Sequence, residues 1–132
     1  MRHLILSGLL AALLTPATAA AGLRDERAIT EGLIVVGMAK EIGDLCPAIA
    51  PRKLRGINYL WSLAREAQGL GYSRAEIEAF VEDDAEKDRL EAIARERLAA
   101  KGARPGDAEA HCAVGRAEIA AGSAIGRFLS LR

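Results

Sequence analysis

The sequence predicts an all-α protein, a small bundle of four to five helices held by one disulfide. Apolar residues recur mainly at helical spacing, and no segment shows the clean apolar-polar alternation of a half-buried strand. Capping residues, glycines and prolines separate the apolar segments from one another. The chain contains two cysteines, Cys46 and Cys112, and both follow the segment that we expect to be removed on export.

The N-terminus has the pattern of a signal peptide. A short basic start precedes an apolar run over residues 4–14, and Ala17 and Ala19 then supply the small side chains that signal peptidase requires. A membrane span needs about 20 apolar residues, so the shorter run favours a signal peptide over an anchor. We expect a signal peptide over residues 1–19, cut after Ala19 or, as the alternative, two residues later. Residues 20–132 then form a single helical domain.

Two cysteines in an oxidising compartment predict first of all a disulfide. A reactive thiol or a metal ligand is the alternative, because His111 precedes Cys112. Adjacent residues of a helix point about 100° apart, so His111 is poorly placed to activate this thiol. We therefore expect a bond between Cys46 and Cys112, and we expect His111 at the surface or boundary of its helix.

The first helix is predicted over residues 25–44. Its middle, residues 32–39, is apolar on all sides, which is typical of a helix buried in a bundle. A buried strand is the alternative, because this stretch is rich in β-branched residues. Cys46 and Pro47 end the helix, since the residue before a proline avoids the helical region.

The second helix is predicted over residues 51–68, because Pro51 suits a first helical turn. One stripe of this helix is apolar, and we expect it to face the core. The stripe consists of Leu54, Ile57, Trp61 and Ala64. Tyr59 lies off this stripe, so we expect it at the surface.

The third helix begins with a capping box formed by Ser73 and Glu76, and Tyr72 with Ile77 forms a hydrophobic staple around it. A break near Asp83 or the next residue separates this short helix from a fourth one, which ends near residue 101. A single continuous helix over residues 73–101 is the alternative.

The last helix is capped by Asp107, and it carries Gly115, Gly122 and Gly126 on one predicted stripe. A glycine costs about 1 kcal/mol relative to alanine inside a helix, so three on one face indicate that another helix crosses closely. Packing against the first helix within the domain is the favoured interpretation. Docking onto a partner helix is the alternative.

Charge and motifs exclude several function classes. The chain has 18 basic and 18 acidic residues, whereas a nucleic-acid-binding protein has a basic excess or stripe. Motifs for nucleotides, metalloproteases and nucleophile elbows are missing from the sequence. The acidic residues 82–88 lack the glycine of a calcium-binding loop. We therefore expect no nucleic acid, no cofactor, no metal site and no catalytic residue.

Four residues are candidates for contact with a partner protein. Arg55 and Tyr59 belong to a basic, aromatic patch along the second helix, and such residues are enriched in interface hot spots. Gly122 and Gly126 belong to the predicted glycine stripe.

Several segments together resemble a family of small exported helical proteins of alphaproteobacteria, a domain of unknown function. These segments are residues 36–42 with Cys46 and Pro47, residues 70–73 with 76–79, residues 84–87, and residues 112–119. Some members are encoded among the genes of respiratory complex I. The resemblance implies a periplasmic protein with an accessory role, and it transfers no catalytic residue.

We expect, from these observations together, a non-catalytic binding or accessory subunit, with a membrane respiratory complex as its partner. Any association with a membrane would then occur only through that partner. A soluble periplasmic chaperone or inhibitor is one alternative, and an enzyme with a carboxylate site of ordinary appearance is another.

Overall fold

The computed structural model of the protein describes residues 22–132, and the predicted signal peptide with its cut after Ala19 lies outside these residues. Within them, five α-helices, two short 3-10 helices and two short strands follow one another along the chain. They are η1 (Leu23–Asp25), α1 (Arg27–Leu45), β1 (Ile49–Pro51), α2 (Lys53–Gly69), α3 (Arg74–Glu82), α4 (Asp84–Ala100), α5 (Ala108–Ala121), η2 (Gly126–Phe128) and β2 (Leu129–Leu131). The predicted all-α class with one disulfide is confirmed.

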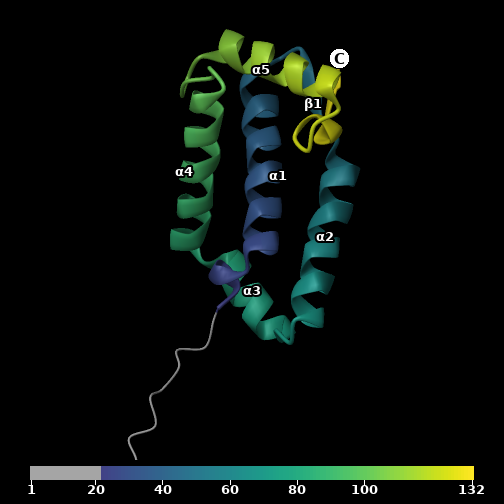
Figure 1. The fold of residues 1–132 in the computed structure, drawn as a ribbon, viewed down its shortest axis with the longest axis vertical. Coiled ribbons are helices and arrows are strands. Elements are labelled where there is room, and N and C mark those ends of the chain that lie inside the picture. The colour runs from purple at the N-terminus through teal and green to yellow at the C-terminus, as the bar shows by residue number, and fades with distance from the viewer. Residues whose placement is uncertain (1–21) are drawn as a thin grey trace, which may run out of the picture.

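The central element is α1, with α4 on one side and α2 on the other (Figure 1). Of these two contacts, the one between α1 and α4 is the more extensive. α5 crosses one end of this group, and α3 connects α2 to α4 at the opposite end (Figure 1). The helices α1, α2 and α4 therefore form an open layer whose two ends are covered.

The main core surrounds α1, as its apolar middle predicts. Ile34, Met38 and Ile42 of this helix are buried together with Leu98 of α4 and Phe128 of the C-terminal segment. The alternative of a buried strand over this stretch is wrong, because α1 continues unbroken to Leu45.

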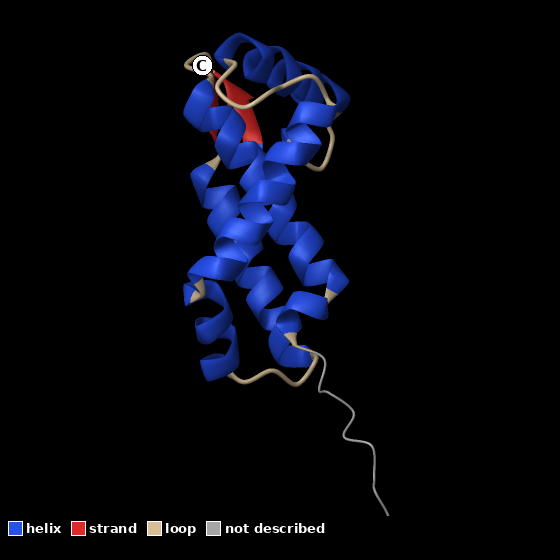
Figure 2. Ribbon diagram, turned by 90° about the vertical axis from the view of Figure 1, so that its left-hand side faces the viewer, coloured by secondary structure: helices blue, strands red, loops and turns tan. Residues whose placement is uncertain are grey.

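Two short strands, which the sequence does not predict, lie beside α5 at one end of the molecule (Figure 2). β1 and β2 pair antiparallel, with Ile49 opposite Leu131 and Pro51 opposite Leu129. The prediction that Pro51 opens the second helix is wrong, since this proline ends β1 and α2 begins at Lys53. Strands of three residues are too short to show alternation, and their pairing depends on the distant C-terminus.

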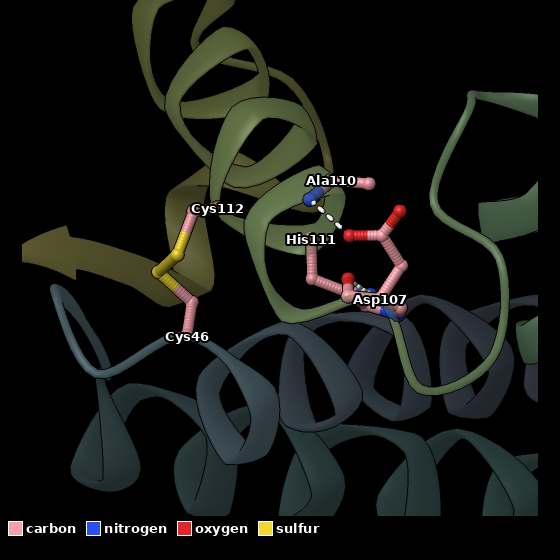
Figure 3. Close-up of a disulfide and its surroundings, with 5 residues drawn as sticks. All are labelled: Cys46, Asp107, Ala110, His111 and Cys112. Carbon is pink, nitrogen blue, oxygen red and sulfur yellow. Dashed lines mark hydrogen bonds between the residues drawn. A yellow bond between two sulfur atoms is a disulfide. The ribbon is translucent and has the colours of Figure 1, made fainter.

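The predicted disulfide between Cys46 and Cys112 is confirmed, with Cα atoms 5.1 Å apart (Figure 3). It joins the C-terminal cap of α1 to the first half of α5. The expectation for His111 is wrong, because only 1 % of this residue is exposed. α5 lies across the end of α1 (Figure 1), and His111 belongs with Cys112, Val114 and Gly115 to its buried residues. Nδ1 of His111 donates to the carbonyl oxygen of Asp107 at 2.6 Å, because that oxygen can only accept (Figure 3).

Gly115 permits the close packing that was expected within the domain. A Cβ atom at this position would lie 2.5 Å from Cδ1 of Ile49 and 2.7 Å from Cγ2 of Ile42. The longer glycine stripe does not exist, because α5 ends at Ala121 and Gly122 turns the chain with φ of +58°. Gly126 lies beyond this turn in η2, so the three glycines do not share a helix face.

The capping box of α3 is confirmed. The Glu76 amide donates to Oγ of Ser73 at 3.1 Å, and the Ser73 amide donates to Oε2 of Glu76 at 2.7 Å. Asp83 separates α3 from α4 and caps α4 by accepting from the Glu86 amide at 3.1 Å. Two helices therefore replace the alternative of one continuous helix.

We expect Ser73→Ala to lower the free energy of unfolding by about 1 kcal/mol, because it removes an N-cap hydrogen bond. Ser73→Asp is the matched control, since aspartate is also a good N-cap residue. Denaturant unfolding of the three proteins measures the effect. Equal midpoints for wild type and Ser73→Ala would mean that the cap contributes nothing to stability.

We expect Cys46→Ala/Cys112→Ala to lower the free energy of unfolding by about 4 kcal/mol, the loop-closure value for this span. The two cysteines are 66 residues apart, and they hold α5 against the end of α1. Denaturant unfolding of the variant against the oxidised wild type measures the difference. A loss below about 1 kcal/mol would show that packing alone holds α5 in place.

Candidate binding surface

The orientation of α2 is the main departure from the sequence prediction. The stripe expected to face the core is instead open to solvent, with 79 % of Leu54, 49 % of Ile57 and 63 % of Trp61 exposed. The buried residues of this helix are Leu63 and Ala67. Both stripes have helical spacing, so periodicity alone does not identify the one that packs.

Tyr59 belongs to the inward side of α2, so the expectation that it lies at the surface is wrong. Its ring is half-buried between two apolar clusters and lies 5.2 Å from the ring of Phe128. A Cβ atom at Gly32 of α1 would lie 2.7 Å from its hydroxyl oxygen, so the glycine permits this approach. The guanidinium of Arg127 lies over the ring, 4.8 Å from its centre. Tyr59 therefore fastens α2 to α1 and to the C-terminal segment.

The other predicted contact residues lie near the same end of the molecule. Nη1 of Arg55 donates to the carbonyl oxygen of Arg127 at 3.1 Å, which ties α2 to η2. Gly126 is buried against the backbone of α5 at Glu118. Gly122 is exposed at the end of α5. Contact of these residues with a partner stays a prediction.

An apolar groove runs between α2 and α4, with α1 as its floor and α3 near one end. It encloses about 350 Å³. Its apolar lining comes from η1 and from four helices: Leu23, Ile29, Leu33, Val36, Gly37, Leu60, Leu63, Ala64, Ala67, Ile77, Phe80, Val81 and Leu90. Its charged lining consists of Lys40, Glu86, Lys87 and Glu91. Such a lining suits an apolar occupant with a few polar contacts at the edge.

The apolar surface continues from the groove over the outside of α2. A second hollow lies on the outer side of α2 and α3, and Leu60, Ala64, Ile77 and Val81 border both spaces. We call the exposed apolar stripe of α2 the α2 ridge. It consists of the exposed Leu54, Ile57, Leu60 and Trp61 together with the half-buried Ala64. A continuous apolar area of this kind marks an interaction surface more often than a solvated one.

Charged residues of both signs flank the α2 ridge. Arg52, Lys53 and Arg55 lie at the start of α2. Glu78 and Glu82 of α3 border the outer hollow together with Ile57 and Trp61. Arg65 of α2 is exposed four residues after Trp61.

Shifted pKa values among the described residues have structural causes. Glu31 of α1 accepts from Arg97 of α4 at 2.6 and 2.8 Å, and this hydrogen-bonded pair lowers the pKa of Glu31. The hydrogen bond from Tyr72 to Glu26, at 2.8 Å, raises the pKa of that tyrosine. These pairs tie neighbouring elements together, so their shifts are explained by the fold and do not by themselves indicate catalysis.

Over residues 22–132, no group of three or more histidine, cysteine, aspartate or glutamate residues is arranged to hold a metal ion. Within the same range, no helix combines the length and the apolar character that crossing a bilayer requires.

Sequence reasoning missed the groove and the exposure of the α2 ridge. One signal was available, since the apolar residues of α2 cover more of its circumference than one packing contact uses. Tyr59, Leu63 and Ala67 form the inward side of α2, and the α2 ridge forms a second apolar side. A helix with two apolar stripes contacts either two neighbours in its own fold or one neighbour and a partner.

Comparison with known proteins confirms the resemblance in a coarser form. No curated protein and no solved structure matches the chain. A protein family does match, over residues 21–130, and its function is unknown, as the resemblance implied. This match covers most of the sequence, so the chain belongs to the family of unknown function DUF5333.

Proposed function

We propose that this protein is a non-catalytic accessory subunit that binds an apolar helix of a partner protein. The observation that carries the proposal is the groove between α2 and α4, whose floor is α1. α2 and α4 lie on either side of α1, and this arrangement leaves open the position that a fourth helix takes in a four-helix bundle. A partner helix laid there would bury its apolar face against side chains from four helices of this chain.

The lining supports a helix as the occupant. Leu33 and Val36 of the floor are half-buried in the protein alone, as are Phe80 and Leu90 at the sides. A partner would therefore remove apolar surface from water, at about 25 cal/mol per Å². Lys40, Glu86, Lys87 and Glu91 at the edge each pair with a charge of this chain, so they would contribute to the specificity of the contact more than to its affinity.

The proposed compartment is the periplasm. The disulfide between Cys46 and Cys112 supports it, because such bonds form and persist in oxidising compartments. The signal-peptide pattern of residues 1–19 supports it as well.

The proposed partner is a periplasm-facing part of a membrane respiratory complex. This part of the proposal depends on the resemblance to alphaproteobacterial proteins encoded among the genes of complex I. A groove that would take the apolar face of a partner helix agrees with an accessory role on a protein complex.

We expect the native protein to co-migrate with a membrane complex after mild detergent solubilisation, and Leu60→Lys to abolish this. Leu60 borders the groove, so a lysine there would place a charge in the contact, a loss of about 2 kcal/mol or more. Leu70→Lys is the matched control, because Leu70 is also exposed and follows α2 but does not line the groove. Native electrophoresis, with identification of the co-migrating proteins, measures the association.

Each variant is first checked for an intact disulfide and a native helical spectrum. Arg55→Ala tests in addition whether the basic, aromatic patch contributes. Equal association of Leu60→Lys and Leu70→Lys would remove the groove from the contact. Wild type that never co-migrates with any membrane complex would contradict the accessory role and favour a soluble chaperone or inhibitor.

A further inference from the structure

We infer that this protein also binds an anionic lipid surface directly, through a cluster of cations at the end of the molecule where α2 begins. We call this cluster the basic end. Arg52, Arg55 and Arg127 form its centre, and Lys53 lies at its edge. The inference goes beyond the proposed function, which includes no direct contact with lipid, and it does not depend on the groove.

Two segments without acidic side chains meet at the basic end. Residues 45–65 contain no aspartate or glutamate, and neither do residues 119–132. The pairing of β1 with β2 places these segments side by side, at the end of the molecule where the C-terminus lies (Figure 1). The Arg52 amide donates to the carbonyl oxygen of Phe128 at 2.7 Å, and Nη1 of Arg55 donates to that of Arg127 at 3.1 Å. Cations that are 72 positions apart in the sequence therefore gather on one surface.

The charges of the basic end are exposed and are not neutralised within the chain. All four side chains are open to solvent. Over residues 22–132, no salt bridge engages any of them. Asp44, at the end of α1 that precedes β1, already pairs with Lys40 at 2.6 Å. Arg132 and the carboxylate of the same residue cancel in charge, so neither changes this balance.

Acidic residues of α3 set the limit of this surface. Glu78 and Glu82 border the outer hollow together with Ile57, one helical turn after Lys53. Arg55 precedes Ile57 by two positions, so the two side chains point about 160° apart around α2. The centre of the basic end therefore faces away from the acidic hollow, and the α2 ridge beyond its first turn takes no part in the contact.

The balanced net charge of the chain does not exclude such a contact. The fields of exposed charges are screened beyond about 8–10 Å at physiological ionic strength. An anionic surface that touches the basic end is therefore affected by the local cations and much less by the acidic residues of α3 and α4.

The fold holds Arg127 in position for binding. Its guanidinium lies over the rings of Tyr59 and Phe128, 4.8 and 4.7 Å from their centres. This stacking uses the faces of the guanidinium, so the N–H groups in its plane can donate to phosphate oxygens. An arginine that is already ordered loses less side-chain freedom on binding.

The cations at the start of α2 do not stabilise their own helix. A helix N-terminus carries a partial positive charge, so Arg52, Lys53 and Arg55 oppose the macrodipole. The first turn of α2 contains no acidic residue that would offset them, and the N-cap supplies no side-chain hydrogen bond. An arrangement that is locally unfavourable for folding is expected at functional sites. Binding of an anion explains these cations better than stability does.

An exposed leucine among the cations favours lipid as the occupant. Leu54 lies between Lys53 and Arg55, and 79 % of it is exposed. Leu131 of β2 is mostly exposed at the same end. A bilayer offers phosphates at the level of the arginines and acyl chains a few ångströms deeper, where a leucine can insert. Both kinds of side chain therefore find a matching layer in one contact.

The first experiment is co-sedimentation of the purified, oxidised mature protein with vesicles of phosphatidylcholine and phosphatidylglycerol in equal parts. Vesicles of phosphatidylcholine alone are the neutral control. We expect binding to the anionic vesicles only, and we expect added salt to weaken it because the charges are exposed. Equal sedimentation with both kinds of vesicle, or with neither, would overturn the inference.

The second experiment compares double variants of equal net charge. Arg52→Gln/Arg55→Gln should weaken vesicle binding at least tenfold, since each cation at an anionic surface adds about fivefold in affinity. Removing cations from the start of a helix does not oppose its dipole, so unfolding does not explain a loss. A thermal unfolding curve of each variant checks this.

Arg74→Gln/Arg104→Gln is the matched control and should bind like the wild type. Both arginines are exposed, lie outside the basic end and form no salt bridge within residues 22–132. Equal loss of binding in the two double variants would show an effect of net charge and overturn the basic end as the contact.

The third experiment distinguishes lipid from an acidic protein. Leu54→Ser should weaken vesicle binding, whereas Leu70→Ser, at an exposed leucine outside the basic end, should not. Equal binding of these two variants would overturn the insertion of Leu54. Binding of polyglutamate without binding of anionic vesicles would overturn lipid as the occupant and assign an acidic protein instead.

The outcome is separable from that of the proposed function, since these experiments use the protein alone with vesicles. Vesicle binding without a co-migrating complex would contradict the accessory role only. Co-migration of a protein that does not bind anionic vesicles would contradict the lipid contact only.

Discussion

The fold depends on the burial of α1, whose middle is apolar around its whole circumference. Such a helix must be covered on every side, and α4, α5 and α2 each cover one part of it. Most of α1 is covered by its extensive contact with α4 and by α5, which comes close to Ile42 at Gly115. The part that these helices leave half-covered, at Leu33, Val36 and Gly37, is the floor of the groove. The proposed binding surface therefore includes the part of α1 that the other helices leave half-covered.

The disulfide and the two short strands lie at the C-terminal end of α1, which is covered by segments distant in the sequence. Cys46 ends α1, and Cys112 belongs to a helix that begins more than 60 residues later, with the bond between them spanning 66 positions. β1 and β2 add a second link at the same end, through the pairing of Ile49 with Leu131. Tyr59 then attaches α2 to this end, through its contacts with Phe128 and Arg127. The other end, at α3, has no such covalent link, and its cluster is smaller.

The position of α2 connects stability to binding. Because its inward stripe uses Tyr59, Leu63 and Ala67, the ridge with Ile57 and Trp61 stays outside. A deeper insertion of α2 would close the groove and bury the ridge. Tyr59 and Leu63 both pack against Gly32, and their bulk sets how closely α2 approaches α1. These two side chains thus keep open the surface on which the partner helix is proposed to bind.

Local features could be predicted from the sequence because they depend on neighbouring residues. The helical class, the capping box of Ser73 and Glu76, the break at Asp83 and the bridge between the two cysteines all have short-range or compositional causes. The tertiary structure alone decided which stripe of α2 faces inward, where α5 ends relative to the glycines, and that the C-terminus pairs with β1. Each of these depends on contacts between segments distant in the sequence, and helical periodicity is the same whichever neighbour a stripe meets. The groove follows from these contacts, so it could be located only once the helices were placed in space.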